Sequence, residues 1–529
     1  MVKFSWTFLT TLLAVWAPSI SALWPQPQHI TTGTTPLRLS QGFSISLSNI
    51  NGPPQDLKDA ITRTQQYLQR DKLQILAVDR GASNAGAISK ASILSKLTLS
   101  LDGGSVTSIS QEAVKPLESR VEGYSLSIPA NGGEAVLHAN TTLGLFRGLT
   151  TFGQLWYDWD GTTYTLEAPV NIVDSPAYPY RGFMLDTARN YFSVSDILRV
   201  LDAMSWVKLN TFHWHVVDSQ SFPLVVPGFE EISQNGAYSS AFTYSTSDVN
   251  YMVQYAAARG IDVIAEIDTP GHTAIIYTSH PEHVACPLAT PWAQFANEPP
   301  AGQLRFASPV TTNFTASLLT SASSLFSSPY LSTGGDELNI NCYTQDAQTQ
   351  QELAQQNKTL EQALDTFTQT THGALRMKGK TPVVWEEMAL VHNVTLGNDT
   401  LVMVWISSQN VQAVAQKGFK VVHAASDYFY LDCGAGEWIG NDPAGNSWCD
   451  PFKTWQKAYT FNPTANLTEA QSKLIMGGKL WWSGAGGNVD TALPRLHDLS
   501  FRFLQRGVNT IPLQPLWCAL RPGACDLTA

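Results

Sequence analysis

At YLSTGGDE, residues Tyr330–Glu337, a short apolar run ends in two glycines and two adjacent carboxylates. Successive side chains of a strand point to opposite faces, so a continuing strand would separate Asp336 from Glu337. A turn just past the strand end can aim both at one ligand, and the glycines give the backbone the freedom to make it. Two carboxylates in one pocket titrate apart, which suits acid-catalysed cleavage of a glycosidic bond.

Similar runs recur along the chain from Tyr180 onward. Each is short enough for a strand, and each is followed by a longer segment that is compatible with a helix. Eight strand–helix units of this kind predict a (β/α)₈ barrel with long loops. The expected strands are Gly182–Leu185, Thr211–Val217, Val263–Ile267, Tyr330–Thr333, Pro382–Trp385, Leu401–Trp405, Lys420–Ala424 and Lys473–Trp482.

Polar residues and tryptophans stand at or just past the end of nearly every expected strand. In a barrel these ends form one face, where active sites lie. The residues concerned are Asp186, Arg189, His215, Asp218, Asp268, His272, Asp336, Glu337, Trp385, Glu386, Trp405, those of 427–432, and Trp482. Packing alone does not explain this one-sided pattern, so we expect a catalytic face.

Residues 23–175 have a different pattern, rich in Gly, Ser and Thr, and predict a smaller α+β domain before the barrel of residues 176–529. Pro176 and Pro179 mark the boundary. The expected helices are Gln55–Gln69 and Leu143–Trp156, and the expected strands are Phe43–Leu47, Leu73–Val78, Leu97–Leu101, Tyr124–Ile128 and Ala135–Ala139.

The N-terminus has the features of a secretory signal peptide over residues 1–22. Lys3 supplies the positive charge, Phe4–Trp16 is largely apolar, and Ala22 ends a small-residue cleavage region. We therefore expect a product that is secreted or enters a vacuolar or lysosomal lumen. The formal net charge of the 529-residue chain is −11, which disfavours nucleic acid and membrane partners.

The cysteines and asparagines agree with a secretory route. Six cysteines predict three disulfides, and spacing favours Cys433–Cys449 and Cys518–Cys525, which leaves Cys286 with Cys342. N-glycosylation acceptors occur at Asn140, Asn313, Asn357, Asn393, Asn398 and Asn466.

Several separated motifs resemble those of the glycoside hydrolase family 20 β-N-acetylhexosaminidases, from Leu23 to about residue 485. They are Leu23–Pro25, Ala139–Thr141, Arg147–Leu149, Thr151–Phe152, Tyr180–Arg189, Phe212–Phe222, Glu266–His272 and Gly334–Glu337. The resemblance implies exo-acting removal of terminal β-linked N-acetylglucosamine or N-acetylgalactosamine from an oligosaccharide or glycoconjugate, with retention. It implies no cofactor and no metal.

The family mechanism is assisted by the substrate, whose 2-acetamido oxygen attacks its own anomeric carbon. By resemblance, Glu337 is the acid and base, Asp336 orients the acetamide, and Tyr430 holds its oxygen. The remaining implied contacts are Arg181 on the 3- and 4-hydroxyls, Asp432 on the 4- or 6-hydroxyl, Trp385, Trp405 and Trp482 around the acetamide methyl, and Asp186 and His272 beside them.

The chain departs from the family pattern at four positions. Ser332 and Asn190 replace histidines, Gly484 stands where a carboxylate would contact the outer hydroxyls, and Lys479 replaces an acidic residue. These changes leave open the preference between the two sugars and the natural substrate, be it chitin oligomers, N-glycans or glycolipids. A homodimer also remains open.

Two other functions compete with this interpretation. Ser332 and Gly484 leave room for a sugar-binding relative without catalysis. His213-Trp214-His215 places two imidazoles on one strand face, so a metal-dependent hydrolase with Asp218, Asp268 and His272 is the second alternative.

Overall fold

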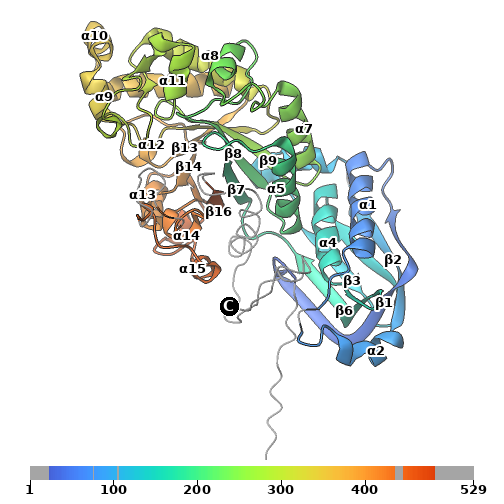
Figure 1. The fold of residues 1–529 in the computed structure, drawn as a ribbon. Coiled ribbons are helices and arrows are strands. Elements are labelled where there is room, and N and C mark those ends of the chain that lie inside the picture. The colour runs from blue at the N-terminus through green and yellow to red at the C-terminus, as the bar shows by residue number, and fades with distance from the viewer. Residues whose placement is uncertain (1–22, 76, 104–105, 435, 437–444, 483–529) are drawn as a thin grey trace, which may run out of the picture.

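The structure, a computed structural model, describes residues 23–75, 77–103, 106–434, 436 and 445–482. Figure 1 shows a sheet covered by helices α1 and α4 beside a larger unit that is built around a barrel. The predicted signal peptide, Gly484, Cys518 and Cys525 lie outside the described residues.

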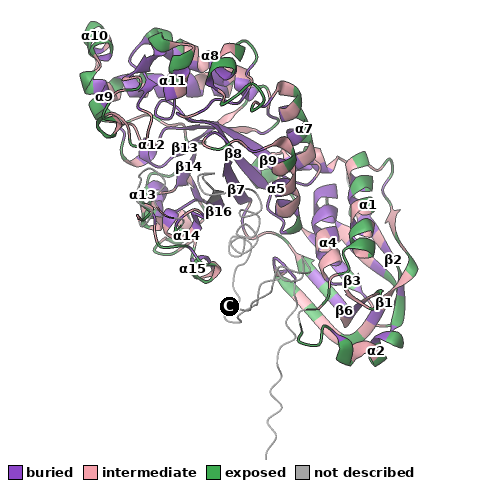
Figure 2. Ribbon diagram, viewed as in Figure 1, coloured by how far each residue is buried: buried purple, intermediate pink, exposed green. Residues whose placement is uncertain are grey.

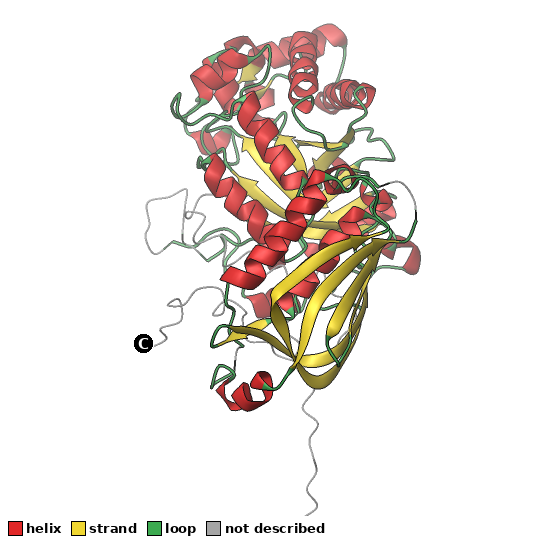
Figure 3. Ribbon diagram, turned by 90° about the vertical axis from the view of Figure 1, so that its right-hand side faces the viewer, coloured by secondary structure: helices red, strands yellow, loops and turns green. Residues whose placement is uncertain are grey.

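The N-terminal sheet has six strands in the order β1-β2-β4-β3-β6-β5, and β1 also pairs with β6. Helices α1 (Gln55–Arg70) and α4 (Thr142–Gln154) bury their apolar sides in a core with the sheet, as Figure 3 lets the reader follow. The strands are β1 (His29–Ser48), β2 (Ser92–Leu101), β3 (Tyr124–Ile128), β4 (Gly133–Ala139), β5 (Tyr157–Trp159) and β6 (Thr162–Asp174).

The strand predicted at Leu73–Val78 is wrong, because none of its described residues lies in a strand. The carboxylate of Asp79 accepts hydrogen bonds from the amides of Gly81 and Ser83, and this local turn competes with strand pairing. Strand β6 was not predicted, although it pairs with both β1 and β3.

The second unit is a closed barrel of eight parallel strands, in the order β7-β8-β9-β12-β13-β14-β15-β16 and back to β7. Each predicted barrel strand is present to within two residues of its expected bounds. They are β7 (Tyr180–Asp186), β8 (Thr211–Val217), β9 (Asp262–Ile267), β12 (Tyr330–Gly334), β13 (Thr381–Trp385), β14 (Leu401–Val404), β15 (Lys420–His423) and β16 (Ile475–Trp482).

Helices surround the barrel strands, and the strands are almost wholly buried (Figure 2). Serine and threonine side chains begin the main helices by accepting a backbone N–H, as Ser193 does for α5 and Ser245 for α7. The helices of this unit are α5 (Val194–Trp206), α6 (Glu230–Gly236), α7 (Thr246–Ala257), α8 (Pro309–Ser323), α9 (Ile340–Gln345), α10 (Ala347–Gln356), α11 (Leu360–Met377), α12 (Glu387–Leu390), α13 (Val411–Gln416), α14 (Ser426–Phe429), α15 (Trp455–Tyr459) and α16 (Glu469–Ser472).

Arg181 ties the two units together, so the prediction that it grips the sugar is wrong. Its guanidinium donates to the Glu122 carboxylate at 2.6 Å and to the backbone oxygens of Lys208 and Tyr178. Burial opposes ionisation of Glu122, but Arg181 and Arg147 together lower its pKa to about 2. Arg181 is the second residue of β7, so it lies at the end of the barrel opposite the catalytic face.

Two of the three predicted disulfides, Cys286–Cys342 and Cys433–Cys449, are present. All six asparagines of the glycosylation motifs are exposed, as an acceptor must be. Among the described residues, no helix combines the length and the apolar character needed to cross a bilayer.

Candidate active site

The turn after β12 brings the two carboxylates together because its backbone is left-handed. The φ angles are 61° at Gly334, 98° at Gly335 and 57° at Glu337. A Cβ atom on Gly334 would lie 1.9 Å from Asp268 Oδ1, and the amide of Gly335 donates to that oxygen at 2.8 Å. The glycine pair is therefore required for the chain to fold tightly around Asp268.

Oxygen atoms of Asp336 and Asp268 lie within 4.8 Å of each other, so each carboxylate affects the pKa of the other. Burial and the charge of Asp336 raise the pKa of Asp268 well above its usual range. Burial also opposes ionisation of Asp336, but the cationic ring of His272 and the proton of Asp268 lower its pKa. Asp336 is thus the charged member of the pair.

Glu337 is about half protonated near neutral pH, so it can supply a proton that Asp336 cannot. Burial raises its pKa to about 7, although His272 opposes this shift. The Nε2 atom of His272 lies 3.6 Å from carboxylate oxygens of both residues. Burial lowers the pKa of His272, but Asp218, Asp268 and Asp336 raise it well above its usual value. One charged carboxylate and one carboxylic acid consequently face the same space.

Arg189, and not Arg181, lies on the catalytic face. Its guanidinium contacts Asp186 at 2.8 Å, Asp218 at 3.1 Å and Glu298. Asp186 is fully buried, and its carboxylate also accepts a hydrogen bond from the backbone N–H of Arg189. The resemblance implies a sugar contact for Asp186, whereas in the structure this residue holds Arg189. Glu298 was missed because it lies deep in the long connection between β9 and α8, far in sequence from the end of β9.

Behind the catalytic pair, histidines and carboxylates alternate through the barrel. His215 lies 2.5 Å from Glu266 on one side and 2.5 Å from Asp218 on the other. Burial opposes protonation of His215, but these hydrogen bonds raise its pKa to about 10. The His213 ring lies 3.1 Å from Glu266, and burial together with Lys479 lowers its pKa to about 4.

Two of the departures from the family pattern join this network. Ser332 donates to Glu266, so the serine at this position still supports the buried carboxylate. The amine of Lys479 is fully buried, contacts His213 Nδ1 and lies 4.1 Å from the ring centroid of Trp385. Burial lowers the pKa of this amine well below its usual value.

The predicted aromatic residues gather beside the catalytic pair. Trp405 stacks on Tyr430 with ring centroids 6.3 Å apart, and its indole N–H donates to Glu387 at 2.9 Å. Burial raises the pKa of Tyr430, and so do the charges of Asp432, Asp336 and Glu337, which places these carboxylates around the phenol. Burial and Asp336 raise the pKa of Glu387 to about 8. No role for Glu387 was predicted.

Trp385 ends β13 and is buried beneath Lys479, and Trp482 ends β16. The side chain of Trp482 lies outside the described residues. The place of Trp482 in the acetamide pocket therefore stays a prediction.

The geometry does not favour the metal-dependent alternative. Both ring nitrogens of His215 face carboxylates, and His213 lies between Glu266 and Lys479. Arg189 contacts Asp218, the carboxylate that the alternative needs as a ligand. Arg189, His215 and His272, whose pKa values are all raised by neighbouring carboxylates, supply positive charge in this cluster.

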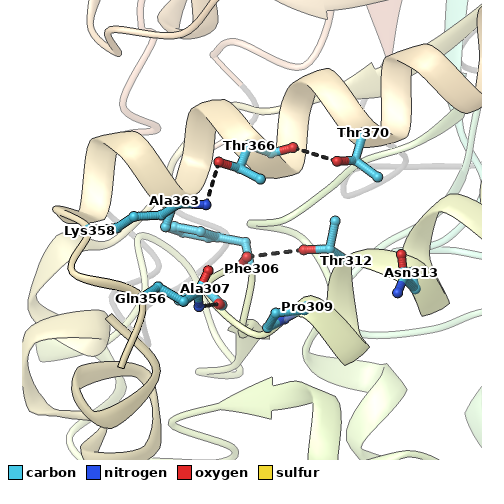
Figure 4. A pocket seen from close by; sticks show the side chains of 10 residues that line it. All are labelled: Phe306, Ala307, Pro309, Thr312, Asn313, Gln356, Lys358, Ala363, Thr366 and Thr370. Carbon is cyan, nitrogen blue, oxygen red and sulfur yellow. Dashed lines mark hydrogen bonds between the residues drawn. The ribbon is translucent and has the colours of Figure 1, made fainter. Parts of the chain in front are cut away.

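A separate pocket between α8 and α11 shows none of the catalytic chemistry (Figure 4). It is lined by Thr312, Thr366, Thr370 and the neighbouring Lys358, which donates to the Thr366 hydroxyl. The smaller hollow at the catalytic face is lined by His272, Glu298 and Glu337, among others. We place the candidate active site there.

Residues 178–492 match the family model "Glycosyl hydrolase family 20, catalytic domain", and residues 23–155 match "beta-acetyl hexosaminidase like". Beta-hexosaminidase 1 of Coccidioides posadasii is 32% identical over 470 residues, which cover 77% of this chain and 78% of the relative. The beta-hexosaminidase subunit beta of Felis catus is 32% identical over 507 residues, which cover 92% and 88%.

Solved structures share the fold. The family 20 exo β-N-acetylglucosaminidase of Vibrio harveyi, in complex with N-acetylglucosamine, has a TM-score of 0.68 at 22% identity, covering 91% of this chain and 73% of that one. The N-acetyl-β-hexosaminidase of Streptomyces plicatus has a TM-score of 0.64 at 21% identity, covering 91% and 90%.

Proposed function

Since the chain belongs to glycosyl hydrolase family 20, we propose that it is an exo-acting β-N-acetylhexosaminidase that works by retaining, substrate-assisted catalysis. The observation that carries the proposal is the split between two adjacent carboxylates. The pKa of Glu337 is about 7, whereas that of Asp336 is lowered. One site therefore offers a proton and a negative charge at the same pH.

In the first step, Glu337 protonates the glycosidic oxygen while the 2-acetamido oxygen of the substrate attacks the anomeric carbon. The bond to the leaving group breaks, and a positive charge develops on the cyclised acetamide. Asp336, whose pKa is lowered by His272 and Asp268 against the effect of burial, stabilises that charge. In the second step, water attacks the anomeric carbon, the Glu337 carboxylate takes a proton from this water, and the bond between the carbon and the acetamide oxygen breaks. The acetamide is regenerated, and two successive inversions retain the configuration.

The side chains around Asp336 and Glu337 bind the substrate. Arg189 replaces Arg181 as the arginine that orients the sugar hydroxyls, because it is the one beside Glu298 and His272. Tyr430 holds the acetamide oxygen, and Asp432 binds an outer hydroxyl. Trp385, Trp405 and Trp482 enclose the acetamide methyl group.

The decisive test compares 4-nitrophenyl N-acetyl-β-glucosaminide and its galacto epimer with plain 4-nitrophenyl β-glucoside. Hydrolysis of the first two and poor hydrolysis of the third is expected, since the glucoside lacks the internal nucleophile. A wild-type protein that binds N-acetylglucosamine but releases no nitrophenol would favour the sugar-binding alternative. Efficient glucoside hydrolysis would contradict substrate assistance.

We also propose how the chain is divided into domains, how it is processed and where the product is found. Residues 1–22 are a signal peptide, residues 23–175 and 176–529 are the two domains, and the glycosylated product is secreted or lies in a vacuolar or lysosomal lumen. Mass spectrometry of the mature protein tests the cleavage site, the sugars on the exposed asparagines and the Cys518–Cys525 disulfide. Light scattering of the same sample tests the homodimer.

A further inference from the structure

Outside the active site, two histidines and a glutamate converge at the short 3₁₀ helix η4 (Pro281–His283). Glu282 Oε1 lies 3.4 Å from His280 Nδ1 and 3.8 Å from His283 Nε2. The three ligand atoms lie within 4.8 Å of one another. A tetrahedral zinc ion with bonds of about 2.0–2.2 Å holds its ligands about 3.3–3.6 Å apart, so these separations are close to those of a zinc site.

The second nitrogen of each histidine is held by a residue from another element. Glu231 of α6 lies 2.9 Å from His280 Nε2, and Thr311 of α8 lies 3.0 Å from His283 Nδ1. Phe314 packs against both rings, with centroids 4.9 Å and 4.2 Å away. Metal-binding histidines are oriented in this way by outer hydrogen bonds, which leave the other nitrogen free to coordinate.

The site is open to solvent on one side. The Glu282 side chain is 59% exposed, while those of His280 and His283 are 22% and 7% exposed. Arg305 is the neighbouring cation, and its guanidinium is paired with Asp346 at 2.9 Å. An ion can therefore enter from water and keep one water molecule as its fourth ligand.

We propose that His280, Glu282 and His283 form a zinc-binding site. Two imidazoles and one carboxylate suit Zn²⁺, whereas Mg²⁺ and Ca²⁺ prefer oxygen ligands alone. The inference is independent of the proposed hydrolase activity, and no catalytic residue belongs to the site.

Bound zinc would stiffen the connection between β9 and α8. This segment carries His272 and Glu298 to the active site, and His283 leads directly into β10 (Val284–Ala285), which pairs with β11 (Gln303–Leu304). Glu231 and Thr311 already link the two histidines to α6 and α8, and bound zinc would hold both histidines in the orientation that makes these contacts. We therefore expect stabilisation of the folded protein, because the ion binds a site that unfolding destroys.

The test uses full-length, untagged, EDTA-treated protein. Zinc binding is measured by competition with a chromophoric chelator, and thermal stability is measured with zinc or magnesium. We expect each chain to take up one zinc ion in competition with the chelator. The Tm should rise to a plateau as zinc is added and should not rise with magnesium. Cobalt in place of zinc should give the strong visible absorption that is typical of tetrahedral coordination. The variants Glu282→Gln and His280→Ala should abolish all three, and Glu231→Gln should weaken binding about 10- to 100-fold.

The matched control is His138→Ala, which removes a half-exposed histidine beside Asp102 that belongs to none of the potential metal-ligand groups among the described residues. This variant should bind zinc like the wild type. Because Glu282 is exposed, Glu282→Gln should fold normally, and circular dichroism checks this. Zinc binding that persists in Glu282→Gln and His280→Ala, or that is displaced by a substrate analogue, would overturn the proposal.

Discussion

Glu337→Gln tests the protonation state that the structure assigns to the general acid. The pKa of Glu337 is about 7 against a usual value of 4.5. At pH 7 about 50% of a group with a pKa of 7 is protonated, against ~0.3% for a pKa of 4.5, so burial increases the active form about 150-fold. Loss of the acid should lower kcat/KM for a disaccharide about 10²- to 10⁴-fold.

The pH profile gives the sharper measurement, since kcat/KM reports the free enzyme. A raised pKa means that Glu337 keeps its proton up to about pH 7. Wild-type kcat/KM should therefore fall tenfold per pH unit above pH 7, and this fall is the basic limb of the profile. The lowered pKa of Asp336 keeps this carboxylate ionised. The fall of kcat/KM on the acid side of the profile, the acid limb, should therefore lie below pH 3.8, the usual pKa of an aspartate. Both limbs are measured with diacetylchitobiose and with a 4-nitrophenyl glycoside.

Glu386 provides a matched control, because burial raises its pKa to about 7 as well, while it is bonded to Asn410 at 2.8 Å. Glu386→Gln should keep the basic limb, and Glu337→Gln should remove it. The loss should be smaller for the nitrophenyl glycoside, whose leaving group needs little protonation. A basic limb that disappears in Glu386→Gln and survives in Glu337→Gln would refute the assignment.

Asp336→Asn should lower kcat about 10²- to 10³-fold, weaken a thiazoline analogue and move the basic limb to lower pH, because the charge of Asp336 raises the pKa of Glu337; an unmoved limb would contradict this coupling. Arg189→Lys should lower kcat/KM about 10- to 100-fold, whereas Arg181→Lys should lower Tm with little change in KM; the reverse pattern would restore Arg181 as the sugar-binding arginine. Lys479→Met should raise the free energy of unfolding by about 1 kcal/mol, measured by urea titration, because a buried amine is replaced by an apolar chain of similar length; a clear loss of stability would show that the contact with His213 outweighs burial.

The amino-acid sequence determined the barrel and its catalytic pair, because both depend on local patterns. Each barrel strand is a short apolar run between polar segments, and the carboxylates follow two glycines whose positive φ angles make the turn. Two disulfides could be predicted for a similar reason, since few pairings suit the spacing. The direction of β7 also indicated which arginine lies on the catalytic face, although the family resemblance pointed to Arg181. Arg181 precedes the apolar run and Arg189 follows it, so only Arg189 can lie on the catalytic face.

Only the tertiary structure decided the electrostatics of the site, because the groups that shift each pKa are distant in the sequence. The pKa of Asp336 depends on Asp268 and His272, and Glu298 reaches Arg189 from a loop with no regular pattern. Likewise, Glu231 approaches His280 from α6, across 49 positions of sequence. Local periodicity predicts elements, whereas the burial and charge around a side chain arise when those elements pack together.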